Sequence, residues 1–306
     1  MADAERQLAL EGAQRLRVAV LAVLSGLLFF GGQIWITLIG TKEPTIGLLQ
    51  GLAPAFNGLK EAAVDPRTIK EQFLVHHQVP LIAAFALSGI GVLMMIAPMR
   101  YLSGAERRRA ATPSPLTSQF ALAGPVMYGV FLLVFEISLI IGAHNYLSGT
   151  ARTYTALNAA TGGGVRVALQ LILTLGTLLL AVVFIMVSLR SMRVGLLTRM
   201  MGTIGIISGV LFLIPLTPLP VIQSLWLIFF GAMLLGFGNR PLPEAWAAGE
   251  ARPWPPRQPP PQRQPRGGGR GGGLRRGAAS AQPAVPAPSV PRGPSPSASK
   301  KRKRRR

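Results

Sequence analysis

Hydrophobic residues along this chain gather into six long runs that are separated by more polar segments. A run of about 20 apolar residues is long enough to cross the hydrocarbon core of a bilayer as a helix. The pattern therefore predicts an all-α, polytopic membrane helix bundle with six transmembrane helices. The predicted helices cover residues 18–40, 78–98, 120–142, 166–188, 200–217 and 219–238.

Two connections between these helices carry structural signals of their own. The sequence PLTPLP at 215–220 predicts a tight hairpin between the last two helices, because its prolines break a helix. The first connection, 41–77, is an outer loop that is long for a bare link. Asp65 as N-cap and Pro66 at the first helical position predict a short interfacial helix there, which would enter the second spanning helix with a bend near Pro80.

Arginine and lysine in the short loops predict the orientation of the bundle. They gather before the first helix, between helices two and three, and between helices four and five. Because basic loops stay on the cytoplasmic side, both termini are expected in the cytoplasm.

Composition agrees with a membrane protein, since 49% of the residues are hydrophobic and only 14% are charged. The net charge of +21 resembles that of a nucleic-acid-binding protein, but 16 of the 32 Lys and Arg residues follow position 238. Residues 239–306 are rich in Pro, Gly and Arg, which predicts a disordered basic cytoplasmic tail.

The end of the tail is the most basic part of the chain. Its cluster consists of Lys300, Lys301, Arg302, Lys303, Arg304, Arg305 and Arg306. Such a cluster is expected to contact anionic lipid headgroups on the cytoplasmic surface. A solvated extension without a specific partner is the second interpretation. Nucleic acid ranks third, because no aromatic residue for base stacking follows Trp254.

Four polar side chains interrupt the apolar runs at similar depths. Glu136 lies within LLVFEISLIIGAHNYL (132–147), and Gln33, Gln170 and Gln223 lie in three other predicted helices. Counting along each helix places all four roughly 6–11 Å below the outer hydrocarbon surface. Because a charged group facing acyl chains is unfavourable, we expect these side chains to converge inside the bundle.

Periodicity supports this expected polar cluster. Arg166, Gln170, Thr174, Thr177 and Ala181 share one polar or small face of the fourth helix, and Gln33 lies on a similar face of the first. Within the cluster, Arg166 is the expected charge partner of Glu136. His144 or His76 would lie near its opening.

Two functions agree with such a cluster. The buried amides and one Glu–Arg pair could hold the helices together, as in a structural or interaction protein. Alternatively, the pocket around Glu136 could bind a cation, a proton or a small solute, as in a transporter or sensor. The first is the leading hypothesis, and the second stays open.

Enzymatic chemistry finds no support in the sequence. The chain has no cysteine, which excludes thiolate nucleophiles, disulfides and Cys-ligated zinc. It has no P-loop, no HExxH motif and no nucleophile elbow. Adjacent His76 and His77 point about 100° apart on a helix, which disfavours a shared metal. We therefore expect a non-enzymatic protein without a metal or cofactor.

One segment resembles a known kind of protein. The sequence SLRSMRVGLLTRMMGTIGIISGVLFLIPLTPLPVIQSLWLIFFGAMLLG (188–236), followed by RPLPEAWAAGEARPWP, resembles uncharacterised actinobacterial multi-pass membrane proteins, similar to a bacterial six-helix family of unknown function. The resemblance implies a bacterial plasma membrane protein. It implies no activity or catalytic residues. Within the same segment, GIISG (205–209) predicts close packing between helices.

Overall fold

The computed structural model describes residues 2–47, 56–58, 65–112, 115–214, 216, 219–237 and 242–255. Every regular element in these ranges is an α-helix, which confirms the predicted all-α class. The helices are α1 (Ala2–Gly40), α3 (Thr68–His76), α4 (Gln78–Met94), α5 (Ile96–Arg109), α6 (Pro115–Ser148), α7 (Tyr154–Thr161), α8 (Gly164–Arg193), α9 (Arg199–Leu213), α10 (Val221–Leu235) and α11 (Glu244–Ala248).

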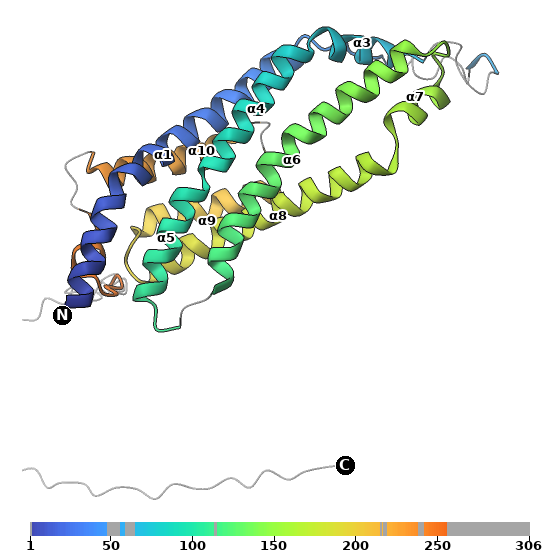
Figure 1. Ribbon diagram of the computed structural model, residues 1–306. Coiled ribbons are helices and arrows are strands. Elements are labelled where there is room, and N and C mark those ends of the chain that lie inside the picture. Colours follow the sequence, from blue (N-terminus) through green and yellow to red (C-terminus); the bar gives the residue numbers. More distant parts are fainter. Residues whose placement is uncertain are drawn as a thin grey trace, which may run out of the picture. The chain divides into compact units, whose positions relative to one another are not determined.

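Four helical segments are long and apolar enough to cross a membrane. They are Leu8–Gly40, Gln78–Arg109, Pro115–Ser148 and Gly164–Arg193. The second segment joins α4 to α5, and the two helices meet at Met95, where the helical ladder is interrupted. The expected bend near Pro80 lies at His77, whose backbone is not helical (φ -103°, ψ 18°) and which separates α3 from α4 (Figure 1). Pro80 itself lies in the first turn of α4, where its missing N–H has no helical partner to lose.

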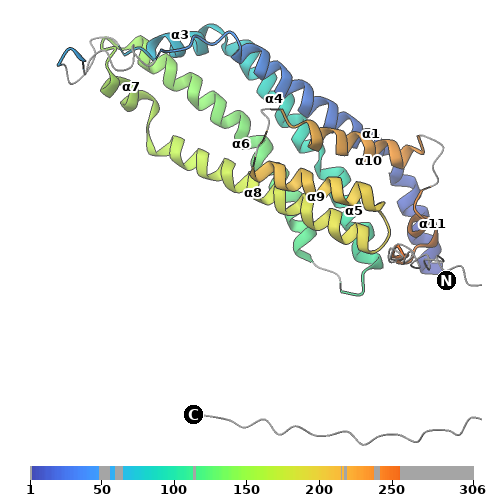
Figure 2. The ribbon, with the colours of Figure 1, turned by 180° about the vertical axis from the view of Figure 1, so that it is seen from behind.

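The prediction of six full-length spanning helices is not met by α9 and α10. Each has 15 residues, which corresponds to about 22 Å, whereas a hydrocarbon core is about 30 Å thick. The predicted range 200–217 includes residues of the proline-rich connection, and the predicted range 219–238 extends past the end of α10, where Gly236 adopts a left-handed conformation. The two helices form a hairpin that runs along only part of the bundle (Figures 1 and 2).

The six apolar elements pack in a closed order. α1 packs on α4, α4 on α6, α6 on α8, α8 on α9, α9 on α10, and α10 on α1. We call the end of the bundle with α3 and α7 the α3 end, and the opposite one the α11 end (Figures 1 and 2). The hairpin occupies the part nearer the α11 end, so α1 and α8 continue beyond it toward the α3 end.

Burial along α8 shows the same asymmetry. Seven of its nine buried residues lie between Leu180 and Ser191, where α9 covers the helix. The half nearer the α3 end buries only Leu169 and Gly176. The first half of α8 therefore packs on one side only.

Glycines allow the helices to approach closely. A Cβ atom on Gly209 would lie 2.7 Å from the carbonyl oxygen of Ala181, and one on Gly26 would lie 2.7 Å from that of Ser224. Gly209 belongs to the GIISG pattern, which therefore packs α9 against α8 within the chain. These contacts fix the hairpin between α8 and α1 through backbone surfaces.

The expected tail boundary at residue 239 is wrong for residues 242–255. Trp246 of α11 is buried, and its indole donates to the carbonyl of Leu196 at 2.9 Å. Trp254 donates to the carbonyl of Leu197, also at 2.9 Å. Both indoles thus hold the connection between α8 and α9. Residues 256–306, including the basic cluster, lie outside the described residues.

Charged and aromatic groups join this segment to the start of α1. Glu11 accepts hydrogen bonds from Arg108 and Arg109 at 2.8–3.0 Å, and Arg109 also donates to the carbonyl of Ala245. Tyr101 stacks on Trp246, with ring centroids 5.5 Å apart. Since Arg109 and Glu11 are buried, this network closes the α11 end of the bundle.

Adjacent glycines in α1 provide a test of the close packing. A Cβ on Gly32 would lie 2.7 Å from the backbone nitrogen of Ser88 in α4. A Cβ on Gly31 would meet no atom of a neighbouring described element within 4 Å. We expect Gly32→Ala to lower the free energy of unfolding by about 1–3 kcal/mol, because α4 must move away. Gly31→Ala should leave it unchanged or raise it, since alanine favours helix. Denaturation in detergent micelles measures both. Equal effects of the two variants would contradict the close contact of α1 and α4.

Candidate solute-binding pocket

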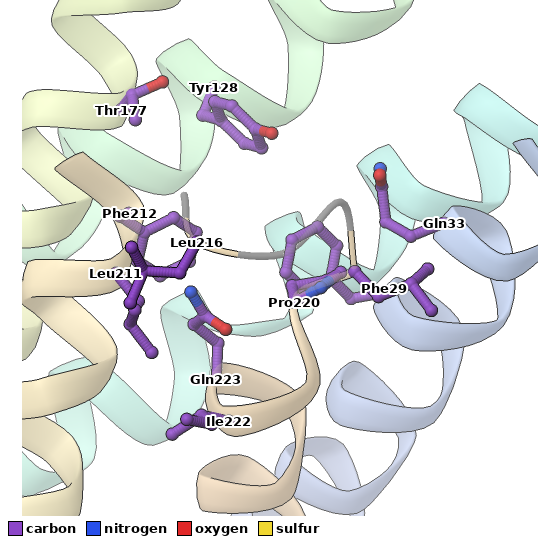
Figure 3. Close-up of a pocket in the computed structure, with 11 residues that line it drawn as sticks. Phe29, Gln33, Tyr128, Thr177, Leu211, Phe212, Leu216, Pro220, Ile222 and Gln223 are labelled. Carbon is purple, nitrogen blue, oxygen red and sulfur yellow. The ribbon is translucent and has the colours of Figure 1, made fainter. Parts of the chain in front are cut away.

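A cavity of about 230 Å³ lies at the tip of the α9–α10 hairpin (Figure 3). Its lining comes from α1, α6, α8, the ends of α9 and α10 and the connection between them. Four of the eleven lining residues are polar: Gln33, Tyr128, Thr177 and Gln223. The other seven are apolar, and none is charged. We call this cavity the hairpin pocket.

The sequence of the hairpin explains why its tip stops here. Thr198 caps α9 by accepting a hydrogen bond from the backbone N–H of Met201 at 3.2 Å. The helix then ends at Leu213, two residues before Pro215. Pro220 precedes the first residue of α10. A proline is tolerated at such a helix start but not in a helix interior, so the apolar run is divided into two short helices.

Two polar groups in the hairpin pocket have no hydrogen-bond partner among the described residues. The side chain of Gln223 is 5% exposed, and it forms no hydrogen bond with another described residue. The hydroxyl group of the half-buried Tyr128 likewise forms no hydrogen bond with a described residue, and Figure 3 shows both side chains at the cavity. Because buried polar groups are nearly always hydrogen-bonded, these two require water or a solute as partner.

The other two polar residues are already engaged by the protein. Gln33 donates from Nε2 to Oγ of Ser88 at 2.8 Å, which ties α1 to α4. Thr177 donates to the carbonyl of Leu173 at 2.9 Å. The pocket therefore offers one free amide and one free phenol against aromatic and aliphatic walls. This combination suits a small neutral solute that has both polar and apolar parts.

The expected convergence of polar residues is met only in part. Gln33 and Gln223 line the same cavity. Glu136 is 5% exposed but lines neither this cavity nor the one described next, and it forms no hydrogen bond or ion pair with a described residue. The expected pair of Glu136 with Arg166 is not formed.

Arg166 and Gln170 line a second cavity, of about 350 Å³, nearer the α3 end. The guanidinium group of Arg166 donates to the carbonyl of Thr161 at 3.0 Å. Its electrostatic neighbour is Glu71 of α3, not Glu136. Burial raises the pKa of the Glu71 carboxyl, and the positive charges of Arg166 and Arg67 oppose that change.

The two histidines expected near the opening lie at the α3 end. His144 and His76 are both exposed, and neither lines the two cavities. The ring of His76 contacts that of His77 edge-on, with centroids 5.0 Å apart. No group of three His, Asp or Glu side chains in the described ranges is placed to hold a metal ion.

The α3 end also confirms the predicted helix in the 41–77 loop. α3 begins at Thr68, two residues later than Pro66, because Asp65 first turns the chain by accepting the backbone N–H of Arg67 at 2.8 Å. The guanidinium group of Arg67 holds the pKa of the Asp65 carboxyl below its usual value. Thr68 and Tyr146 hydrogen bond at 2.7 Å, so α3 is attached to α6.

Sequence reasoning missed Tyr128, because a single tyrosine in an apolar run resembles an ordinary core residue. The spacing of Tyr128 from Phe135 is a signal that could have identified it as a lining residue. The two residues are seven apart, so they share one face of α6, and each lines one of the two cavities.

Comparison of the chain with protein-family models, with curated proteins and with solved structures finds no match.

The two glutamines in the pocket should differ in their effect on stability. Gln33→Leu removes a hydrogen bond to buried Ser88 and should lower the free energy of unfolding by about 1 kcal/mol. Gln223→Leu removes an amide without a protein partner, so it should leave that free energy unchanged or raise it by up to about 1 kcal/mol. Denaturation of both variants in the same detergent measures the difference. A larger loss for Gln223→Leu would contradict the free amide.

Proposed function

We propose that this chain is a non-enzymatic plasma membrane protein that binds a small neutral solute in the hairpin pocket, as a transporter or a sensor. The free groups of Tyr128 and Gln223 at the tip of a half-length hairpin carry the proposal. Hydrocarbon cannot serve as their hydrogen-bond partner, so the pocket must contain water or a solute.

Depth supports this argument. The tip of the hairpin lies beside Phe29 of α1, and α1 continues about 16 Å beyond that residue to Gly40. Non-helical backbone at such a depth is tolerated only where it is buried in protein or lines a water-filled cavity.

The polar face of α8 offers a route to the pocket. Ala181 lies against Gly209 of α9, Thr177 lines the hairpin pocket, and Gln170 and Arg166 follow on the same face toward the α3 end. Solutes would therefore reach the pocket from the α3 end. We assign this end to the outer side of the membrane.

The distribution of basic residues supports that orientation. Near the α11 end, many arginines gather at the helix termini: Arg107, Arg108, Arg109, Arg190, Arg193 and Arg199. The described residues of the α3 end carry fewer basic groups, which are Lys42, Arg67, Lys70, Arg152 and Arg166. By the positive-inside rule, the α11 end faces the cytoplasm. The basic cluster Lys300 to Arg306 would then reach anionic lipids of the inner leaflet.

A purely structural or interaction role remains the competing proposal. It is favoured by the hydrogen bond of Gln33 with Ser88, which joins two helices as a buried amide is expected to do. It gives no role to the unpartnered groups of Tyr128 and Gln223. The solute-binding proposal accounts for both observations.

Water access to the pocket separates the two proposals. The chain has no cysteine, so single cysteines can be labelled without background. We expect Thr177→Cys to react with a membrane-impermeant thiol reagent added from the α3 side, because Thr177 lines the pocket. The readout is the labelling rate of the full chain in oriented proteoliposomes.

Leu178→Cys is the matched control. Leu178 is 44% exposed on α8, but it lies outside the pocket and about 100° around the helix from Thr177. It should face acyl chains and react at least about tenfold more slowly, since a thiol in hydrocarbon does not ionise readily. Failure of Thr177→Cys to react faster than Leu178→Cys would leave the structural role.

A further inference from the structure

The second cavity lies at the boundary between polar and apolar surface near the start of α8. Arg166 and Gln170 form its polar part, and Phe135, Val167 and Leu171 form much of its apolar part. Of the described residues that line it, Arg166 alone carries a charge. We call this cavity the vestibule.

Helix register places the vestibule and the hairpin pocket on the same faces of α6 and α8, from which we infer one groove. The pocket takes Tyr128 from α6 and Thr177 from α8, and the vestibule takes Phe135 and Gln170 from the same two helices. From the pocket to the vestibule, the lining residue lies seven positions later on α6 and seven positions earlier on α8, because the two helices are antiparallel. Seven residues correspond to two turns, or about 10 Å, on an unchanged helix face.

The groove therefore has two stations along the contact of α6 with α8. The half of α8 between them is covered on one side only, because the hairpin ends at the level of the inner station. Thr174 lies between Gln170 and Thr177, and its hydroxyl group donates a hydrogen bond to the carbonyl of Gln170 at 2.8 Å. A solute leaving the vestibule would meet mainly neutral groups.

The charge at the vestibule is available to a solute. The described residues accept one hydrogen bond from Arg166, at the carbonyl of Thr161. The charged group that interacts with it is Glu71 of α3, which also interacts with Arg67. Arg67 is paired with Asp65 at 2.8 Å, which leaves Glu71 as the acid nearest in effect to Arg166.

We propose that the vestibule is the entrance to the hairpin pocket, and that Arg166 is its specificity-determining residue, admitting anionic and neutral polar solutes in preference to cations. This inference rests on the proposed solute-binding function. Because a single charge in a narrow, partly dry groove changes the local concentration of ions, it acts on the rate of access. The neutral pocket then selects for hydrogen bonding.

Charged thiol reagents of similar size test the proposal. In the full-length Thr177→Cys chain, we expect an anionic methanethiosulfonate to react faster than a cationic one after correction for their rates with a free thiol. Arg166→Gln should lower this anion-to-cation ratio by about three- to tenfold. Arg166→Lys keeps the charge and should restore most of the ratio.

Lys70→Gln is the matched control, since Lys70 is a half-exposed cation of α3 that is paired with Glu43 at 2.8 Å. It should leave the ratio unchanged. An unaltered ratio in Arg166→Gln, with Thr177→Cys still reactive, would overturn the role of Arg166 while the solute-binding function stands. Loss of all labelling at Thr177→Cys in the parent chain would overturn both.

Discussion

The structure depends on a mismatch between helix length and membrane thickness. α9 and α10 are too short to cross about 30 Å of hydrocarbon, yet they are among the most apolar helices of the chain. A backbone turn cannot face lipid, because its N–H and C=O groups would lose their hydrogen-bond partners. The turn exposes the apolar side chains of Ile214 and Leu216, and it also lines the hairpin pocket between α1, α6 and α8. We infer that its backbone groups find their hydrogen-bond partners on the pocket side.

Close packing keeps the short hairpin at this level. Gly209 and Gly26 bring its two helices onto the backbones of α8 and α1. At its base, Trp226 donates to the carbonyl of Met201, while Trp246 and Trp254 hold the connection that leads into α9. The segment 242–255 thus packs into the core at the base of the hairpin through Ala245 and Trp246.

Much of the architecture was predictable from hydrophobic periodicity. The four long spanning segments and the proline hairpin follow from runs and breaks in the sequence. The short length of the hairpin helices could not be predicted in the same way, because residues 200–217 are apolar up to the prolines. Hydrophobicity alone does not show that α9 ends after 15 residues and not after the 18 of the predicted range. Trp246 was missed because its neighbours have the composition of a flexible tail, whereas the buried indole is held by the distant carbonyl of Leu196.

The candidate site shows a similar limit. Counting residues gives the depth of a side chain along a helix, and this correctly grouped Gln33 with Gln223. Counting does not show which neighbouring helix a side chain faces. The sequence therefore groups Glu136 with Arg166, although the two side chains lie in different surroundings. Glu136 and Phe135 are adjacent in sequence, and a rotation of about 100° separates a lining residue from one outside both cavities.

The central claim is that the hairpin turn lies within the membrane and contacts water there. A spin label at Leu216→Cys, a residue that lines the pocket, tests it most directly by electron paramagnetic resonance in nanodiscs. The account predicts a label in the middle third of the bilayer by comparison with lipid standards, with strong collisions with a water-soluble relaxation agent. A label at the bilayer surface, or one at depth that meets oxygen but no water-soluble agent, would contradict it.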